Sequence, residues 1–315
     1  MFPHWLLTQI GRFTSRNKLS ILIYHQVFAQ KDPMRPSEPD ADEFRWQMQL
    51  ISQYFNPLPL TEAVNLLKQG KLPANSICVT FDDGYLNNLQ IAQPILQEFA
   101  IPATVYIATG FSQGCNMWND RLIDLIGHQQ LNKVNLSALS MPEVSVSDWQ
   151  SRRKLVSELI PKIKYQDYQT RQQTVDKLYQ DNHVAEQKRK MMTPDEVIQL
   201  HQKGVDIGAH TVDHPILTAQ TVEQQRQQIN DSKQLIEQWL GHPISGFAYP
   251  NGKSDTDYNS DSVEQVKLAN FQYAVATDWG VSTPTTHHLE LKRFTPWDRN
   301  DKKFHLRLIR NIIGI

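Results

Sequence analysis

The chain has 315 residues, of which 40% are hydrophobic and 21% are charged, so it can bury a globular core and disorder is not the expectation. Its net charge of −1 gives no reason to expect a nucleic acid partner. The two cysteines, Cys78 and Cys115, are too few for a disulfide framework, and no apolar run is long enough to span a bilayer.

Residues 1–19 form an N-terminal segment with an apolar stretch at 2–13. This stretch lacks the positively charged start, the long apolar run and the small-residue cleavage site of a secretory signal. We therefore expect a cytoplasmic protein. We expect residues 2–13 to pack against the protein body, and weak peripheral contact with a membrane through an amphipathic helix is the alternative.

The rest of the chain alternates between apolar runs and amphipathic stretches. The runs predict strands at 20–25, 76–81, 103–108, 205–210, 246–249, 272–276 and 289–294. Helical spacing and end signals predict helices at about 40–55, 61–70, 87–99, 193–204 and 222–240. This alternation predicts an α/β fold with a parallel sheet, either open or closed into a barrel. The stretch at about 112–192 breaks the pattern, and we interpret it as a helical insertion in a single domain spanning 20–315.

The strongest polar motif follows the predicted strand 76–81. There Asp82 and Asp83 stand together before Gly84, and their mutual repulsion would be costly without a cation or a proton. Asp-Asp-Gly is also good turn chemistry, so this motif alone leaves a structural turn and a functional site equally open. In parallel α/β folds, however, sites form at the carboxyl ends of strands.

A second motif, Gly208-Ala-His-Thr-Val-Asp-His-Pro215, ends the predicted strand 205–210. Pro215 disfavours a helix at His214, so we expect His210 to end the strand and His214 to lie on the following turn. Two imidazoles and one carboxylate can hold a metal ion and leave open positions for water and substrate. A pair of structural histidines is the alternative.

Three weaker signals complete the set. They are the loop Phe247-Ala-Tyr-Pro-Asn-Gly252, His25 after an apolar run, and Leu291-Lys-Arg-Phe294 with His287 and His288 upstream. Each of these is more often structural when it occurs alone.

Taken in order, these motifs resemble those of the polysaccharide deacetylase family, the NodB homology domain of carbohydrate esterase family 4. The resemblance extends from about Ser20 to Trp297, apart from the insertion. It implies an irregular (β/α) barrel of the NodB type. It also implies a hydrolase that removes the N-acetyl group, or an O-acetyl group, of an amino sugar in a bacterial-type glycan or glycan precursor and releases acetate.

The resemblance also implies roles for individual residues. Asp82 matches the catalytic base, and Asp83, His210 and His214 match the ligands of a divalent metal ion, expected to be Zn²⁺. Four residues match positions on the substrate side of the site, where a backbone N–H near Tyr249 would help to hold the oxyanion: Thr211, Tyr249, Pro250 and Asn251.

The chain departs from the family in two places. Ala248 stands where many members have an arginine that orients the base, and Leu291-Lys-Arg293 lacks the late histidine that acts as the general acid. We predict that Arg293 lies at the site in place of the missing arginine, among the substrate-binding groups, and that His25 is the acid. His287 and His288 are less favoured because they precede their predicted strand.

Two other functions remain open from the sequence. A non-haem iron oxygenase also uses two histidines and one carboxylate, although it does not require a second aspartate. A glycan-binding protein on an inactive deacetylase fold would explain the missing arginine and histidine.

Overall fold

The computed structural model describes residues 3–295 and 297–314. The chain divides into two compact units. Unit 1 comprises Met1–Lys31, Ser37–Gln113 and Met192–Ile315, and unit 2 comprises Asp32–Pro36 and Gly114–Met191. The stretch predicted as an insertion, about 112–192, thus corresponds closely to the long segment of unit 2. That it is an insertion within a single domain stays a prediction.

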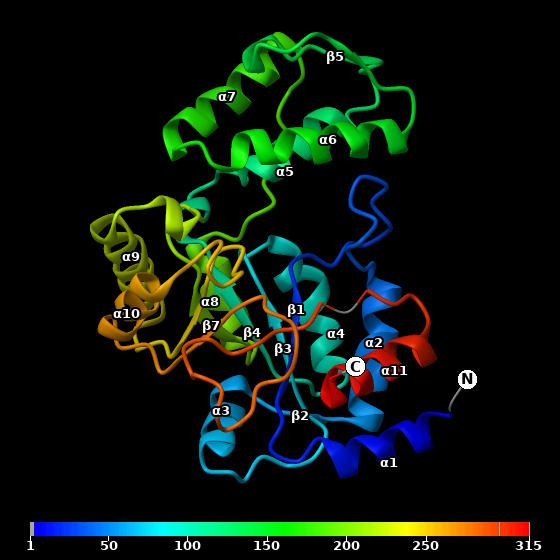
Figure 1. Cartoon of the computed structure of the whole chain (residues 1–315). Coiled ribbons are helices and arrows are strands. Elements are labelled where there is room, and N and C mark those ends of the chain that lie inside the picture. The colour runs from blue at the N-terminus through cyan, green and yellow to red at the C-terminus, as the bar shows by residue number, and fades with distance from the viewer. Residues whose placement is uncertain (1–2, 296, 315) are drawn as a thin grey trace. The chain divides into compact units, whose positions relative to one another are not determined.

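Unit 1 alternates strands and helices, as Figure 1 shows. Its strands are β1 (Ser20–Tyr24), β2 (Asn56–Pro57), β3 (Ser76–Phe81), β4 (Ala103–Ile107), β7 (Asp206–Ala209), β8 (Gly246–Ala248) and β9 (Tyr273–Val275). Its α-helices are α1 (His4–Thr14), α2 (Ala41–Tyr54), α3 (Leu60–Lys68), α4 (Gln93–Glu98), α8 (Pro194–Gln202), α9 (Val222–Leu240), α10 (Ser260–Leu268) and α11 (Asp301–Ile313).

The strands of unit 1 form one parallel sheet in the order β1-β3-β4-β7-β8-β9, with β2 paired to β3. The register pairs Tyr24 with Phe81 and Ile107 with Ala209. Parallel pairing puts the carboxyl ends of all these strands at the same edge of the sheet. The residues directly after β1, β3 and β7 are therefore brought together at that edge.

The segment predicted as a seventh strand, 289–294, is not a regular strand. It makes two isolated parallel bridges instead, one from Leu291 to Val275 of β9 and one from Phe294 to Leu22 of β1. The segment passes from one edge strand to the other within six residues, so it cannot stay in register with either. It links the two open edges of the curled sheet and leaves Arg293 between the two bridges.

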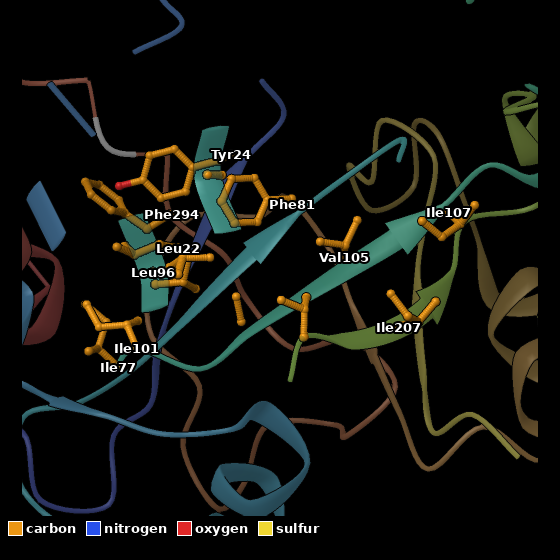
Figure 2. Close-up of a cluster of buried hydrophobic side chains, with 14 of the residues drawn as sticks. Leu22, Tyr24, Ile77, Phe81, Leu96, Ile101, Val105, Ile107, Ile207 and Phe294 are labelled. Carbon is orange, nitrogen blue, oxygen red and sulfur yellow. The ribbon is translucent and has the colours of Figure 1, made fainter. Parts of the chain in front are cut away.

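The core of unit 1 lies on the sheet and under its helices. Figure 2 shows Leu22, Tyr24 and Phe81 beside Phe294, and Val105, Ile107 and Ile207 further along the sheet. Strand β3 is buried at all six positions, which is typical of a parallel strand covered on both faces.

The helix ends follow local chemistry, with two differences from prediction. Helix α8 has Thr193 as its cap in a capping box with Glu196, and Gly241 ends α9 with a positive φ. The predicted helix at about 61–70 corresponds to α3, which starts one residue earlier, at Leu60, and has no side-chain cap. The predicted helix 87–99 begins as a π-helical turn, η1 (Asn88–Ala92), before α4.

Helix α1 packs against α11 and buries Leu7 and Gly11. Trp5 and Phe13, by contrast, are 65% and 86% exposed. Residue 2 of the predicted segment 2–13 lies outside the described residues, and membrane contact through this segment stays a prediction. No helix among the described residues has the length and apolar character needed to cross a membrane.

Unit 2 has its own hydrophobic cluster, which includes Leu125, Leu159 and Val175. It consists of α5 (Trp118–Gly127), α6 (Trp149–Lys164), α7 (Tyr168–Asp181) and a small antiparallel pair, β5 (Lys133–Val134) and β6 (Val144–Ser145). Within this unit, the Arg35 guanidinium binds the carboxylates of Asp120 and Asp124 at 2.6 and 2.9 Å.

Candidate metal and catalytic site

Four polar residues predicted for the site come from three strand ends of unit 1. Asp82 and Asp83 follow β3, His210 follows β7, and His25 follows β1. Strands β3 and β7 flank β4, so their ends lie close enough for the side chains to meet across it. Asp82, Asp83 and His210 are buried, and His25 is half-buried.

Asp83, His210 and His214 converge on one point. The Nε2 atoms of His210 and His214 each lie 3.5 Å from Oδ1 of Asp83. Among the described residues, this trio is the only group of three or more His, Cys, Asp or Glu side chains whose possible ligand atoms all lie within 4.8 Å of one another.

The chemistry of the trio fits a divalent metal ion. Oδ1 of Asp83 is buried without a hydrogen-bond partner, which is costly unless a cation is nearby. Nδ1 of His210 is held 2.7 Å from the carbonyl oxygen of Ala248. A carbonyl only accepts, so Nδ1 carries the proton and Nε2 presents its lone pair toward Asp83. Two imidazole nitrogens and one carboxylate oxygen are a suitable donor set for Zn²⁺.

The electrostatics of the trio also favour a positive charge. Burial raises the pKa of Asp83, but His210, His214 and His25 outweigh burial and hold this pKa well below its ordinary value. Burial lowers the pKa of His210, but Asp82 and Asp83 outweigh it and raise this pKa above its ordinary value. Both shifts mean that the site stabilises positive charge beside its carboxylates, as a bound cation would supply.

The loop that carries His214 is fixed by polar contacts. Oγ1 of Thr211 accepts the N–H of His214 at 3.2 Å. Oε1 of Gln228, on α9, accepts the N–H groups of Val212 and Asp213 at 3.1 and 2.9 Å. Gln228 was not predicted as a site residue, because a glutamine on a helix gives no sequence signal for this role. Thr211 is fully buried, so it positions His214 and is not an open substrate contact.

The backbone at the site is strained in several places. Asp83, Thr211, His214 and Asn251 all have positive φ values, between 50° and 75°, which non-glycine residues adopt rarely. Such strain tends to gather at functional sites, where the surrounding structure enforces it.

Arg293 binds Asp82 through both carboxylate oxygens. Its Nη1 and Nη2 lie 2.6 and 2.7 Å from Oδ1 and Oδ2, and its Nε donates to the carbonyl of Ala276 at 2.8 Å. Arg293 thus lies at the site, where Ala248 leaves the family's usual position without an arginine. Its side chain is fully buried and holds Asp82, which favours a role in orienting the base over the predicted role among the substrate-binding groups.

This ion pair sets the charge state of Asp82. Burial raises the pKa of Asp82, but Arg293, His210 and His25 together lower it below the ordinary value of 3.8. Asp82 is therefore ionised at neutral pH. Each of its oxygens uses one lone pair for Arg293 and keeps another with which to accept a proton.

His25 lies near both carboxylates. Its charge lowers the pKa of Asp82 and of Asp83, and its backbone carbonyl accepts a hydrogen bond from Asn88 at 2.9 Å. Its ring makes no hydrogen bond to the described residues. His287 and His288 lie elsewhere: His287 pairs with Glu290, and burial together with the nearby Lys68 of α3 lowers the pKa of His288.

In the loop Phe247–Gly252, the backbone contributes more to the site than the side chains do. Tyr249 is fully buried, stacks on Tyr258 and donates its hydroxyl to the carbonyl of Leu289, so its side chain does not line an open acetyl pocket. The backbone N–H of Tyr249 donates to the carbonyl of Val275, so any oxyanion donor must be a neighbouring N–H. Pro250 is buried, whereas Asn251 is exposed at the same edge.

Comparisons with known proteins agree with this geometry. Residues 161–274 match the family model described as polysaccharide deacetylase, and this stretch includes His210, His214 and the Tyr249 loop. The chain is 23% identical over 267 residues to a putative polysaccharide deacetylase, YxkH, of Bacillus subtilis, across 84% of this chain and 67% of that protein. It is 27% identical over 144 residues to a poly-beta-1,6-N-acetyl-D-glucosamine N-deacetylase of Staphylococcus aureus. That match spans 45% of this chain and about half, 48%, of the staphylococcal enzyme.

Two solved structures share the fold over almost the whole chain. The Streptococcus pyogenes deacetylase PplD, solved with acetate, has a TM-score of 0.63 at 19% identity, over 93% of this chain and 98% of its own. IcaB from Ammonifex degensii has a TM-score of 0.60 at 16% identity, over 94% and 97%. These similarities confirm the predicted irregular (β/α) barrel.

Proposed function

We propose that the chain is a polysaccharide deacetylase, which hydrolyses the acetyl amide of an amino sugar in a glycan and releases acetate. The observation that carries the proposal is the pairing of two adjacent aspartates with different partners. Asp83 faces two histidines, while Asp82 is held by Arg293. One carboxylate is thus available to a metal ion and the other to a proton.

The substrate class rests on the relatives. The staphylococcal proteins that match 45% of this chain are N-deacetylases of a poly-N-acetylglucosamine. We therefore favour an N-acetylated hexosamine glycan as substrate over an O-acetylated one.

Each residue has one task in this mechanism. A divalent cation held by Asp83, His210 and His214, for which Zn²⁺ is the best fit, would polarise the acetyl carbonyl and acidify water. Asp82 accepts the proton of the attacking water. Arg293 holds both Asp82 oxygens in place, so little reorganisation is needed when the proton arrives.

The leaving amine must be protonated, because an amide nitrogen leaves poorly as an anion. We propose His25 as the donor. Its ring is half-buried and lies close enough to Asp82 and Asp83 to lower both their pKa values.

The same geometry weighs against the other two functions. An oxygenase needs the three metal ligands but has no use for a second carboxylate fixed by a buried arginine. An inactive binding protein would have no need for the buried Asp82–Arg293 ion pair, because removing two charges from water costs free energy.

Acetate release is the direct test. Purified protein is incubated with poly-N-acetylglucosamine oligomers, first as isolated, then after chelation, and then with Zn²⁺ restored. The proposal predicts acetate, its loss on chelation and its recovery with metal, without oxygen consumption. Absence of acetate from N-acetylated and O-acetylated glycans alike, with metal bound, would overturn it.

A further inference from the structure

Two histidines face each other outside the catalytic site. His201 lies near the end of α8 and His242 follows α9, beside the start of β7. Their Nε2 atoms are 2.9 Å apart. They lie at the amino end of β7, whereas His210 follows its carboxyl end. This pair therefore belongs to the opposite edge of the sheet from Asp83, His210 and His214.

The other nitrogen of each ring is already committed. Nδ1 of His201 lies 3.1 Å from the carbonyl oxygen of Val205, and Nδ1 of His242 lies 3.0 Å from that of Pro243. Because a carbonyl can only accept, each Nδ1 carries the proton of its neutral ring. Both Nε2 atoms then present lone pairs to each other, which is repulsive unless a metal ion or an added proton lies between them.

His210 has the same arrangement in the catalytic site. There too Nδ1 donates to a backbone carbonyl and Nε2 points at the place where a metal would bind. A carbonyl partner of this kind is what fixes the orientation of metal-binding histidines. Two rings fixed in this way, with converging lone pairs, are a bidentate site for a transition-metal ion.

We propose that His201 and His242 form a second divalent-metal site, for an ion such as Zn²⁺ or Ni²⁺ that prefers imidazole nitrogen. Two imidazoles on one tetrahedral Zn²⁺ have nitrogens about 3.3 Å apart, so the rings must separate by a few tenths of an ångström. His242 is exposed and can move by this amount.

Asp206 gives the site a nearby negative charge. It is the first residue of β7. Burial raises the pKa of Asp206, and the two histidines oppose this rise without cancelling it. Among the described residues, no third His, Cys, Asp or Glu ligand atom completes a compact trio with the two nitrogens. Water would therefore fill the remaining positions, and we expect weaker binding here than at the catalytic trio.

The site also joins two elements of unit 1 that are distant in the sequence. The bound ion would connect the end of α8 to the turn after α9, on either side of the start of β7. It therefore stabilises the folded chain, because the two histidines meet only when these elements are in place.

The test is a metal titration in a chain whose catalytic trio is disabled. In the full-length His210→Ala/His214→Ala variant, we expect one equivalent of Zn²⁺ or Ni²⁺ to bind in calorimetry and to raise the melting temperature. Adding His242→Ala should abolish both effects. Adding His183→Asn, a change to another exposed histidine, should leave both unchanged.

The catalytic site and this site are separable in the outcome. Wild-type protein should bind two equivalents, and His242→Ala alone should lose only the weaker one and keep its acetate release. Equal binding and equal thermal shifts in the two disabled variants, with and without His242, would overturn the proposal. That result would leave the function of Asp83, His210 and His214 untouched.

Discussion

Asp82 and Asp83 are neighbours in the chain with opposite surroundings. Asp83 has a positive φ, and its carboxylate lies beside His210 and His214. Asp82 directly follows β3, and its carboxylate binds Arg293. A single backbone turn therefore separates a metal ligand from a base. Substitutions at the two positions should have different effects.

Asp82→Asn should keep the metal and lose activity, since the amide cannot accept the proton of water. A general base contributes about 100- to 10,000-fold in rate. Acetate release and metal content are measured together, and Asp83→Asn serves as the comparison because it should lose metal first. An Asp82→Asn protein within about tenfold of wild-type activity would exclude Asp82 as the base.

Arg293→Met should destabilise the protein and shift its response to acid. Breaking a buried ion pair by removing one partner costs about 3–5 kcal/mol. In the wild type, the lowered pKa of Asp82 contributes stability that is present above 3.8 and is lost as the pH falls through the folded value. The variant should lack this contribution wherever the wild type has it, so the stability difference should be largest above 3.8 and shrink in acid. The acid limb of its activity profile should move to higher pH.

The measurement is urea unfolding at a series of pH values, with Arg293→Lys as the control. Lysine keeps the charge but not the two parallel hydrogen bonds, so it should fall between wild type and Arg293→Met. Equal stability for Arg293→Met and wild type would contradict the assigned pairing.

His25→Gln should keep the metal and the fold but reduce turnover strongly, because glutamine cannot donate a proton to the leaving amine. The alkaline limb of the pH profile should disappear, since that limb reports loss of the protonated acid. His287→Gln is the matched control and should behave as wild type. Full activity with an unchanged profile in His25→Gln would leave the acid elsewhere.

At the scale of elements, α8 leads into β7 and so into the His210 loop. Its amino end is closed by a capping box in which Thr193 and Glu196 bond each other's backbone N–H groups at 3.3 and 2.7 Å. A well-formed amino end of α8 thus helps to fix the start of β7, the strand that is followed by His210.

Thr193→Ala should cost about 1 kcal/mol of stability, because one backbone N–H at the helix start loses its partner. Urea unfolding measures the loss, and Thr193→Ser, which keeps the hydroxyl, should recover most of it. Metal content should be unchanged in both. An alanine variant as stable as wild type would show that water replaces the cap without cost.

At the scale of the whole molecule, unit 2 is held by charges that are distant in sequence. Arg35 comes from the short stretch Asp32–Pro36, yet it binds Asp120 and Asp124 within the same unit. Burial lowers the pKa of Arg35, but the two carboxylates outweigh it and raise this pKa further above its already high value, so the arginine stays charged.

Arg35→Met should destabilise unit 2 selectively, by about 3–5 kcal/mol, because two buried carboxylates lose the guanidinium that they share, although Asp124 keeps its ion pair with Lys190. Hydrogen exchange should show faster exchange across α5, α6 and α7 while β3 and β4 remain protected. Arg153→Met, at a more exposed arginine of the same unit, is the control. Equal loss of protection in both units would contradict a separate unit 2.

The sequence by itself determined the alternation of strands and helices, the strand ends that carry Asp82, Asp83 and His210, and the resemblance to polysaccharide deacetylases. These features depend on short-range patterns: apolar runs, caps and motifs of a few residues. Only the tertiary structure decided which distant groups meet them. Arg293 reaches Asp82 because the segment 289–294 bridges β9 and β1. Gln228 fixes the His214 loop because its side chain extends from α9 to the N–H groups of Val212 and Asp213. The burial of Tyr249 and the facing of His201 and His242 likewise depend on packing between elements, which no local pattern encodes.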